Sequence, residues 1–142
     1  MEAVNAEIEA LLEERGRAAW DKDLDRLMAV FAPEVVYFDI VPPLRYTGAA
    51  ALRDRFADWF GRWQSPIGQQ VQELEILATR EVAAAHMLVR ASGTLLNGRE
   101  VDYFVRVSDS LRRGSAGWLI THEHVSVPVD LATGSAVIDL RP

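Results

Sequence analysis

The chain has 142 residues, of which 49% are hydrophobic and 25% are charged, a balance typical of one soluble globular domain with its own core. A formal net charge of −6 leaves no basic surface to neutralise phosphates, so we expect no nucleic-acid partner. The absence of cysteine excludes disulfides, thiolate nucleophiles and thiolate metal sites. The N-terminal segment is acidic and amphipathic, unlike a signal peptide, and no apolar run approaches the length of a membrane span. We therefore expect a cytoplasmic protein without membrane contact.

The first part of the chain is predicted to be helical. Residues 3–19 place apolar side chains on one stripe at the spacing of an α-helix. A short second helix follows, for which Asp21 or Asp23 can provide the N-cap. Pro33 ends the second helical pattern. Two helices are thus expected before the first strand.

A strand and a third helix come next. Residues 34–40, with the sequence EVVYFDI, are β-branched and aromatic, which favours a strand. After a loop, Thr47 is expected to cap a third helix with large apolar side chains along one side. Four β segments joined by tight connections follow, near residues 70–79, 82–95, 100–112 and 117–127.

This order of elements predicts the fold class. Helices that precede an antiparallel meander are typical of an α+β domain in which the helices pack on one face of the sheet. A curved, mostly antiparallel sheet closed by three helices leaves a cone, and the open end of such a cone can admit a small molecule. The sequence shows no repeat and no linker, so we expect a single domain over residues 1–142.

Arg15 is the most unusual residue of the first helix, because it lies within the apolar stripe. A charge at such a position has to be paired, or has to reach the rim with its long side chain. Two interpretations are therefore open. Its aliphatic stem covers the core while the guanidinium reaches water, or the guanidinium pairs with Asp39 or Asp102 or faces an anionic or enolate oxygen of a ligand.

Two of the late strands each have two contrasting faces, because strand side chains alternate. In residues 100–112, a face with Asp102, Phe104 and Arg106 alternates with a face of valines and Tyr103. In residues 117–127, His122 and His124 share one face and Glu123 lies on the other. Either the helices cover the more apolar face and the histidines point outward, or the polar face turns into the cone.

Three stretches of the sequence carry a resemblance to a known family: DKDLDRLMAVFAPEVVYFD, RYTGAAALRDRF and GWLITHEHVSVPVD. Together with the order of the elements, they are similar to the nuclear transport factor 2-like superfamily, and within it to SnoaL-like proteins and ketosteroid isomerase homologues. The resemblance covers nearly the whole chain. It implies a cone-shaped fold and a single SnoaL-like domain, while proteins of this fold have many different activities.

The resemblance also implies roles for particular residues. Asp39 precedes Gly48 by nine residues, which is where ketosteroid isomerases carry their catalytic aspartate. Asp102, in the segment VDYF, takes the place of their oxyanion-hole aspartate. Their oxyanion-hole tyrosine falls at Arg15, and this departure argues against a steroid isomerase.

The position of Asp102 in the family favours the arrangement in which the polar face of the late strands turns into the cone. His122 would then relay or stabilise charge beside Asp102. The remaining apolar face would be buried between two copies of a homodimer. A His-x-His strand can also supply two metal ligands, with Asp102 or His86 as a third, but we expect hydrogen-bonding histidines and no metal.

The sequence and the resemblance together predict a small-molecule-binding protein that performs acid–base chemistry without a cofactor, of the isomerase, cyclase or lyase type, on a small apolar carbonyl compound. Asp39 would take the proton, while Arg15, Asp102 and His122 stabilise or relay charge. The alternative is a non-catalytic ligand-binding or dimerisation module. The residues expected to contact the ligand are Trp20, Tyr37, Phe56, Trp59, Trp63, Phe104 and His124.

Overall fold

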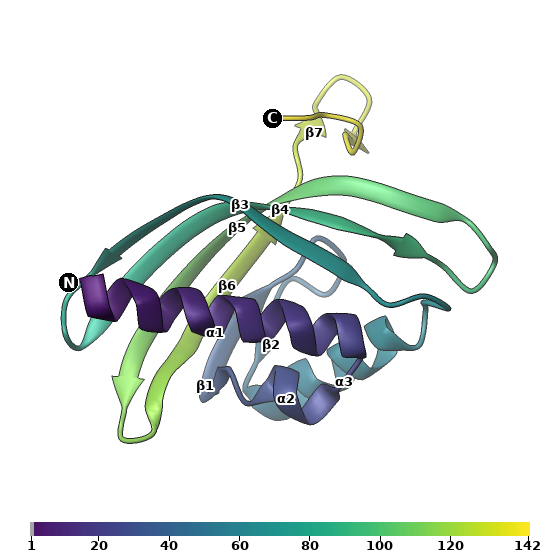
Figure 1. Ribbon diagram of the computed structural model, residues 1–142. Coiled ribbons are helices and arrows are strands. Elements are labelled where there is room, and N and C mark those ends of the chain that lie inside the picture. Colours follow the sequence, from purple (N-terminus) through teal and green to yellow (C-terminus); the bar gives the residue numbers. More distant parts are fainter. Residues whose placement is uncertain (1) are drawn as a thin grey trace.

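The computed structural model describes residues 2–142 and shows three helices packed against the concave side of a curved sheet (Figure 1). The helices are α1 (Glu2–Asp21), α2 (Leu24–Met28) and α3 (Ala49–Phe60). The strands are β1 (Phe31–Phe38), β2 (Tyr46–Thr47), β3 (Gly68–Ala78), β4 (Val82–Thr94), β5 (Glu100–Gly114), β6 (Gly117–Ser126), β7 (Val129–Asp130) and β8 (Ser135–Ala136). None of these helices is long and apolar enough to cross a membrane.

Six of the strands form one sheet in the order β2-β1-β6-β5-β4-β3. Strands β3 to β6 are an antiparallel meander, and β1 pairs with β6 in the parallel direction. The predicted α+β class with a curved, mostly antiparallel sheet is therefore confirmed. The small β7–β8 hairpin lies beyond the end of β6, at the top of Figure 1.

Two predicted boundaries differ from the structure. Pro33 lies inside β1, and the register of β1 against β6 is irregular between Phe31 and Val36. A proline is tolerated at such an irregularity because its missing N–H leaves no regular ladder bond unmade. The third helix is capped by Gly48, whose φ is 89°, and not by Thr47. For the second helix, Asp23 is the N-cap, and its side chain accepts a hydrogen bond from the Arg26 backbone N–H.

The orientation predicted for the late strands is wrong. The apolar face of β5, with Val105, Val107 and Leu111, is buried against the helices, while Asp102 lies on the outer face. Alternation sorts the side chains into two sets, and burial of apolar surface then decides which set faces the helices. In this protein the more apolar face of the late strands is the one that the helices cover.

This orientation also overturns the interface expected for a homodimer. The apolar strand face that the sequence analysis places between two copies consists of Tyr103, Val105, Val107, Val125 and Val127. All of them contact the core of their own chain. A second copy cannot cover a face that the chain's own helices already cover. Dimerisation itself stays a prediction, and the surface available for it lies elsewhere.

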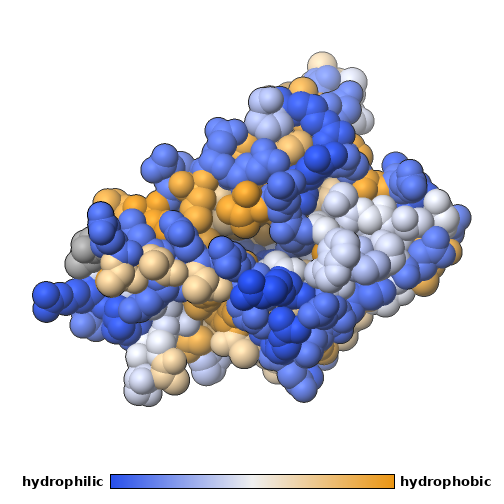
Figure 2. All heavy atoms as spheres, in the orientation of Figure 1, coloured by the Kyte–Doolittle hydropathy of each residue, from blue (hydrophilic) through white to orange (hydrophobic). Residues whose placement is uncertain are grey.

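Hydrophilic residues cover most of the face seen in Figure 2, and apolar side chains gather along the sheet edge above α1. The helices keep their apolar side toward the sheet. In α1, Val4, Ile8 and Leu12 are buried at the spacing that the sequence indicates. Arg15 is the next residue along this buried stripe, so the helix aims its guanidinium into the space between helices and sheet.

Candidate functional site

A cavity of about 90 Å³ lies between the concave side of the sheet and the helices α1 and α3. Strand residues Met87, Val89, Val105 and Val107 form an apolar wall, and Phe56, Trp59 and Trp63 form an aromatic wall. Into this mostly apolar space the chain places eight polar or charged side chains: Arg15, Tyr37, Asp39, Arg55, Gln69, Tyr103, Asp109 and Glu123. A cavity with few, convergent polar groups is the usual form of a small-molecule site.

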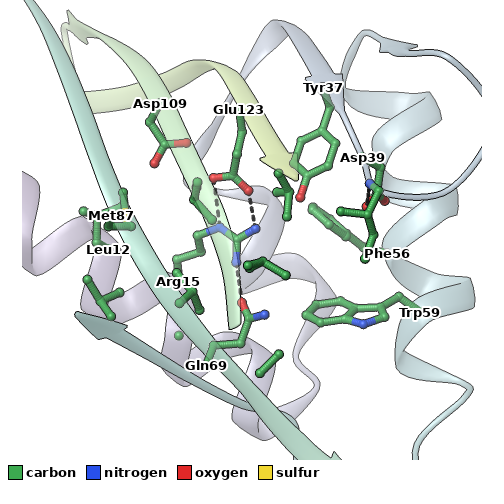
Figure 3. Close-up of a pocket in the computed structure, with 18 of the residues that line it drawn as sticks. Leu12, Arg15, Tyr37, Asp39, Phe56, Trp59, Gln69, Met87, Asp109 and Glu123 are labelled. Atoms are coloured by element: carbon green, nitrogen blue, oxygen red, sulfur yellow. Dashed lines mark hydrogen bonds and ion pairs between the residues drawn. The ribbon is translucent and has the colours of Figure 1, made fainter. Parts of the chain in front are cut away.

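The centre of the cavity is a buried ion pair between Arg15 on α1 and Glu123 on β6 (Figure 3). Arg15 Nε donates to Glu123 Oε2 at 3.3 Å, Arg15 Nη2 donates to Glu123 Oε1, and Arg15 Nη1 donates to Gln69 Oε1 at 2.8 Å. Only 1% of the Glu123 side chain is exposed. Burial alone would lower the pKa of Arg15, but the Glu123 carboxylate raises it above its usual value. The predicted partners of Arg15, Asp39 and Asp102, were therefore wrong.

The guanidinium of Arg15 also contacts two aromatic rings. It lies over Phe31 at 5.6 Å and over Phe56 at 5.9 Å from the ring centroids. Cation–π contacts of this kind are stronger away from water. The side chain is thus fixed by a carboxylate, an amide and two rings, and it does not reach the rim.

Asp109 on β5 is the second buried carboxyl group. The register of the antiparallel pair β5–β6 sets Asp109 directly opposite Glu123, so both side chains project from the same sheet face. Asp109 is 3% exposed, and neither of its carboxyl oxygens has a hydrogen-bond partner among the described residues. Burial, and then the negative charge of Glu123, raise the pKa of Asp109 well above its usual value. The Asp109 carboxyl group therefore favours its protonated form.

Tyr37 on β1 adds a phenol to the same cavity. Its ring meets that of Phe56 edge-on at 5.6 Å between centroids. Burial, followed by the charge of Glu123, raises the pKa of Tyr37 well above its usual value. Since that usual value is already near 10, the phenol keeps its proton at physiological pH.

Asp39 directly follows β1 and lines the cavity, as does Arg15. Its Oδ2 accepts a hydrogen bond from Arg55 Nε at 2.9 Å, and its Oδ1 accepts one from the Ile40 backbone N–H at 2.7 Å. In Figure 3, Asp39 and Asp109 lie on opposite sides of the Arg15–Glu123 pair. The cavity therefore contains two arginine–carboxylate pairs and one carboxyl group without a partner.

The remaining predicted ligand contacts fall into two groups. Tyr37, Phe56, Trp59 and Trp63 line the cavity as expected. Trp20 does not, because it lies near the end of α1, with 55% of its surface exposed, beside a shallow groove between α1 and β3. Its position on α1 therefore keeps Trp20 out of the cavity.

Asp102 and Phe104 do not reach the cavity either. Asp102 accepts a hydrogen bond from Arg90 at 2.8 Å and one from Arg141 at 3.2 Å on the outer sheet face. The hydrogen bond from Arg90 lowers the pKa of Asp102 below its usual range. Arg141 also stacks over the Phe104 ring at 5.5 Å, so the C-terminal residues cover this part of the face. The predicted role of Asp102 beside the ligand is wrong.

His122 and His124 share one patch, as the alternation indicates, but the patch faces away from the cavity. Both rings pack edge-on against Phe38, at 4.7 and 5.4 Å. His122 Nδ1 donates to the Val36 carbonyl oxygen at 2.7 Å. Within residues 2–142, no three histidine or acidic side chains are grouped so that they could hold a metal ion. The residue that does enter the cavity is Glu123, between the two histidines.

Sequence reasoning missed Asp109 and Glu123, although a signal for both exists. On β5, Asp109 follows Val105 and Val107 on the apolar face, and on β6, Glu123 precedes Val125 on the apolar face. An acidic residue that interrupts an otherwise apolar strand face has to be paired or neutral once it is buried. Together with Arg15, whose charge interrupts an apolar helix stripe, these acids indicate a buried charge cluster.

The family model of the SnoaL-like domain matches residues 8–130. Among solved structures, a nuclear transport factor 2-like protein of unknown function from Pseudomonas putida KT2440 is similar, with 29% identity, a TM-score of 0.91, and coverage of 100% of this chain and 99% of that chain. No curated protein matches the sequence.

Two more distant structures share the fold. A protein from Streptomyces avermitilis, proposed to be a dehydratase of the same superfamily, has 14% identity and a TM-score of 0.81 over 91% of this chain and 99% of that chain. A protein from Novosphingobium aromaticivorans, proposed to be an aromatic ring hydroxylase, has 21% identity and a TM-score of 0.81 over 89% and 90% of the two chains. The match over residues 8–130 and the shared fold show that this chain belongs to the SnoaL-like domain family of the nuclear transport factor 2-like superfamily.

Proposed function

We propose that the protein binds a small, largely apolar carbonyl compound in the cavity and performs acid–base chemistry on it without a cofactor, of the isomerase, cyclase or lyase type. The observation that carries this proposal is Asp109, a buried carboxyl group without a partner, which lies directly opposite Glu123. Two neighbouring carboxyl groups with different environments hold one proton between them, and such a pair can supply an acid at neutral pH.

Each polar group of the cavity has a role in this proposal. Asp109 donates its proton to the carbonyl oxygen of the substrate, and the Tyr37 phenol donates a hydrogen bond to the same oxygen. Asp39, at the position that the family resemblance indicates, takes a proton from the neighbouring carbon. The substrate then becomes an enol, and return of the protons at other positions gives the product. Arg15 donates to both oxygens of Glu123 and holds this carboxylate in place, so that the proton of the pair stays on Asp109.

A non-catalytic ligand-binding module is the second candidate, and one observation favours it. Both oxygens of Asp39, the proposed base, already accept hydrogen bonds. Binding without turnover would be the behaviour of such a module.

Proton exchange separates the two candidates. The protein is incubated in D₂O with small cyclic ketones, and loss of the signal of the hydrogens next to the carbonyl group is followed by NMR. The proposal predicts exchange faster than in buffer, which Asp109→Asn slows by about 10²–10⁴-fold because an amide cannot give up a proton. Asp102→Asn, on the outer face, serves as the control and should leave the rate unchanged. Saturable ketone binding without any exchange would identify the binding module instead.

A further inference from the structure

We propose that the cavity accepts only uncharged ligands that carry a hydrogen-bond acceptor, because each charge that lines it is already matched within the chain. The inference concerns the substrate class of the site proposed above and rests on that site. It concerns binding, however, so it holds or fails whether or not the bound molecule reacts.

The charges of the cavity cancel in two pairs. Arg15 faces Glu123, and Arg55 donates to Asp39 at 2.9 Å. Asp109 is the one further carboxylic acid among the described lining residues, and it has no cation to itself. With Asp109 protonated, the formal charges of the lining sum to zero.

An anionic ligand would find no free cation in this arrangement. To pair with Arg15 or Arg55 it would have to displace Glu123 or Asp39, which would leave a carboxylate buried without its partner. Side chains of these two pairs are between 1% and 15% exposed, so water cannot take over the lost contact. A cationic ligand would need Asp109 to ionise first, against the burial that holds its proton.

The hydrogen-bonding groups that remain can all donate a hydrogen bond. The Gln69 amide oxygen accepts from Arg15, and in Figure 3 the amide nitrogen of Gln69 is turned toward Trp59. The Tyr37 and Tyr103 phenols and the protonated Asp109 carboxyl group add three more donors. A ligand gains most here from acceptor oxygens, as in a ketone, a quinone or an ester, set on a body that fills the apolar and aromatic walls.

The proton on Asp109 is the condition for this selectivity. The titratable groups that face Asp109 are Glu123 from β6, Arg15 from α1 and Tyr37 from β1, whereas β4 presents Ala85 opposite it. Removal of the Asp109 proton would turn a donor into an acceptor and leave the cavity with a net negative charge. Affinity for an uncharged acceptor should therefore fall as the pH rises in the wild-type protein, and stay constant in Asp109→Asn.

Three probes of one size but different charge test the inference: acetophenone, benzoate and benzylammonium. Binding is measured by isothermal titration calorimetry with the wild-type protein at pH 6.5, and again for acetophenone up to pH 9. We expect acetophenone to bind at least about tenfold more tightly than either ion. Asp109→Asn should keep this preference, because an amide is also uncharged and also donates.

Benzoate or benzylammonium binding as tightly as acetophenone would overturn the inference, and so would a lack of acetophenone binding. The wild-type panel needs no variant, so a variant that fails to fold does not affect the result. Preferential binding of acetophenone without proton exchange would sustain the inference and refute the proposed catalysis. Proton exchange on a ketone, together with benzoate binding as tight as acetophenone binding, would support the proposed catalysis and refute this inference.

Discussion

The energetic coupling between Asp109 and Glu123 can be tested by a double-mutant cycle. Removal of one partner from a buried ion pair costs about 3–5 kcal/mol, because the other charge is left uncompensated. In Glu123→Gln, however, Asp109 lies directly opposite the lost carboxylate and can ionise to face Arg15. Burial still raises the pKa of Asp109, but the negative charge of Glu123, the next cause that raises it, is then gone. We therefore expect Glu123→Gln to cost less than about 3 kcal/mol.

The other two corners of the cycle follow from the same contacts. Asp109→Asn replaces one uncharged, buried polar group by another, so we expect a cost of about 1–2 kcal/mol. The double variant leaves Arg15 with Gln69 as its remaining hydrogen-bond partner and with no carboxylate at all. It should therefore cost more than the two single variants together, by about 1–3 kcal/mol.

Urea unfolding at pH 7, followed by circular dichroism, measures all four corners. Additivity of the two substitutions within about 0.5 kcal/mol would refute the reasoning, since it would mean that Asp109 does not replace Glu123. A cost of about 5 kcal/mol for Glu123→Gln alone would refute it as well. Asp102→Asn on the outer face is the control for an acid that faces solvent.

Further predictions concern pH, charge and the histidines. Folding raises the pKa of Asp109. The contribution of this group to the free energy of unfolding is therefore fully present below about pH 4, and it is lost as the pH rises toward the raised pKa. The free energy of unfolding is measured for the wild type and for Asp109→Asn across this pH range. The difference between the two proteins should fall by up to about 1.4 kcal/mol per pH unit. Arg15→Met should destabilise the protein by about 3–5 kcal/mol, and Arg15→Met with Glu123→Leu should recover most of this loss in thermal unfolding. His122→Ala should leave ketone binding unchanged by calorimetry, because its ring lies outside the cavity; a stoichiometric metal lost in this variant would contradict our view of the histidine patch.

Much of the fold could be predicted from the sequence because local patterns decide it. The apolar stripe of α1, the Asp23 cap and the four alternating segments after residue 67 each follow from residue spacing. The same patterns placed Arg15 and Asp39 at the cavity, the first as a charge within an apolar stripe and the second by its place after a strand and its family resemblance. In both residues the information lies within a few positions of the chain.

The faces of the late strands could not be predicted in the same way. A period of two sorts side chains into two sets, but it does not say which set meets the helices, and a functional argument about Asp102 favoured the wrong one. Pro33 and Thr47 show the same limit on a smaller scale, because a register irregularity accommodates the first and the backbone at Gly48 replaces the second as cap.

The sequence by itself determined the class of the fold and the family, and it showed that a charged residue lies within the apolar stripe of the first helix. Only the tertiary structure decided what that charge meets. Arg15 and Glu123 are 108 positions apart, and Asp109 lies opposite Glu123 only through the register of β5 and β6. Spacing along the chain specifies local geometry, whereas contacts between distant segments depend on how the sheet curves and which face it buries, so the pairing at the centre of the cavity exists only in the folded chain.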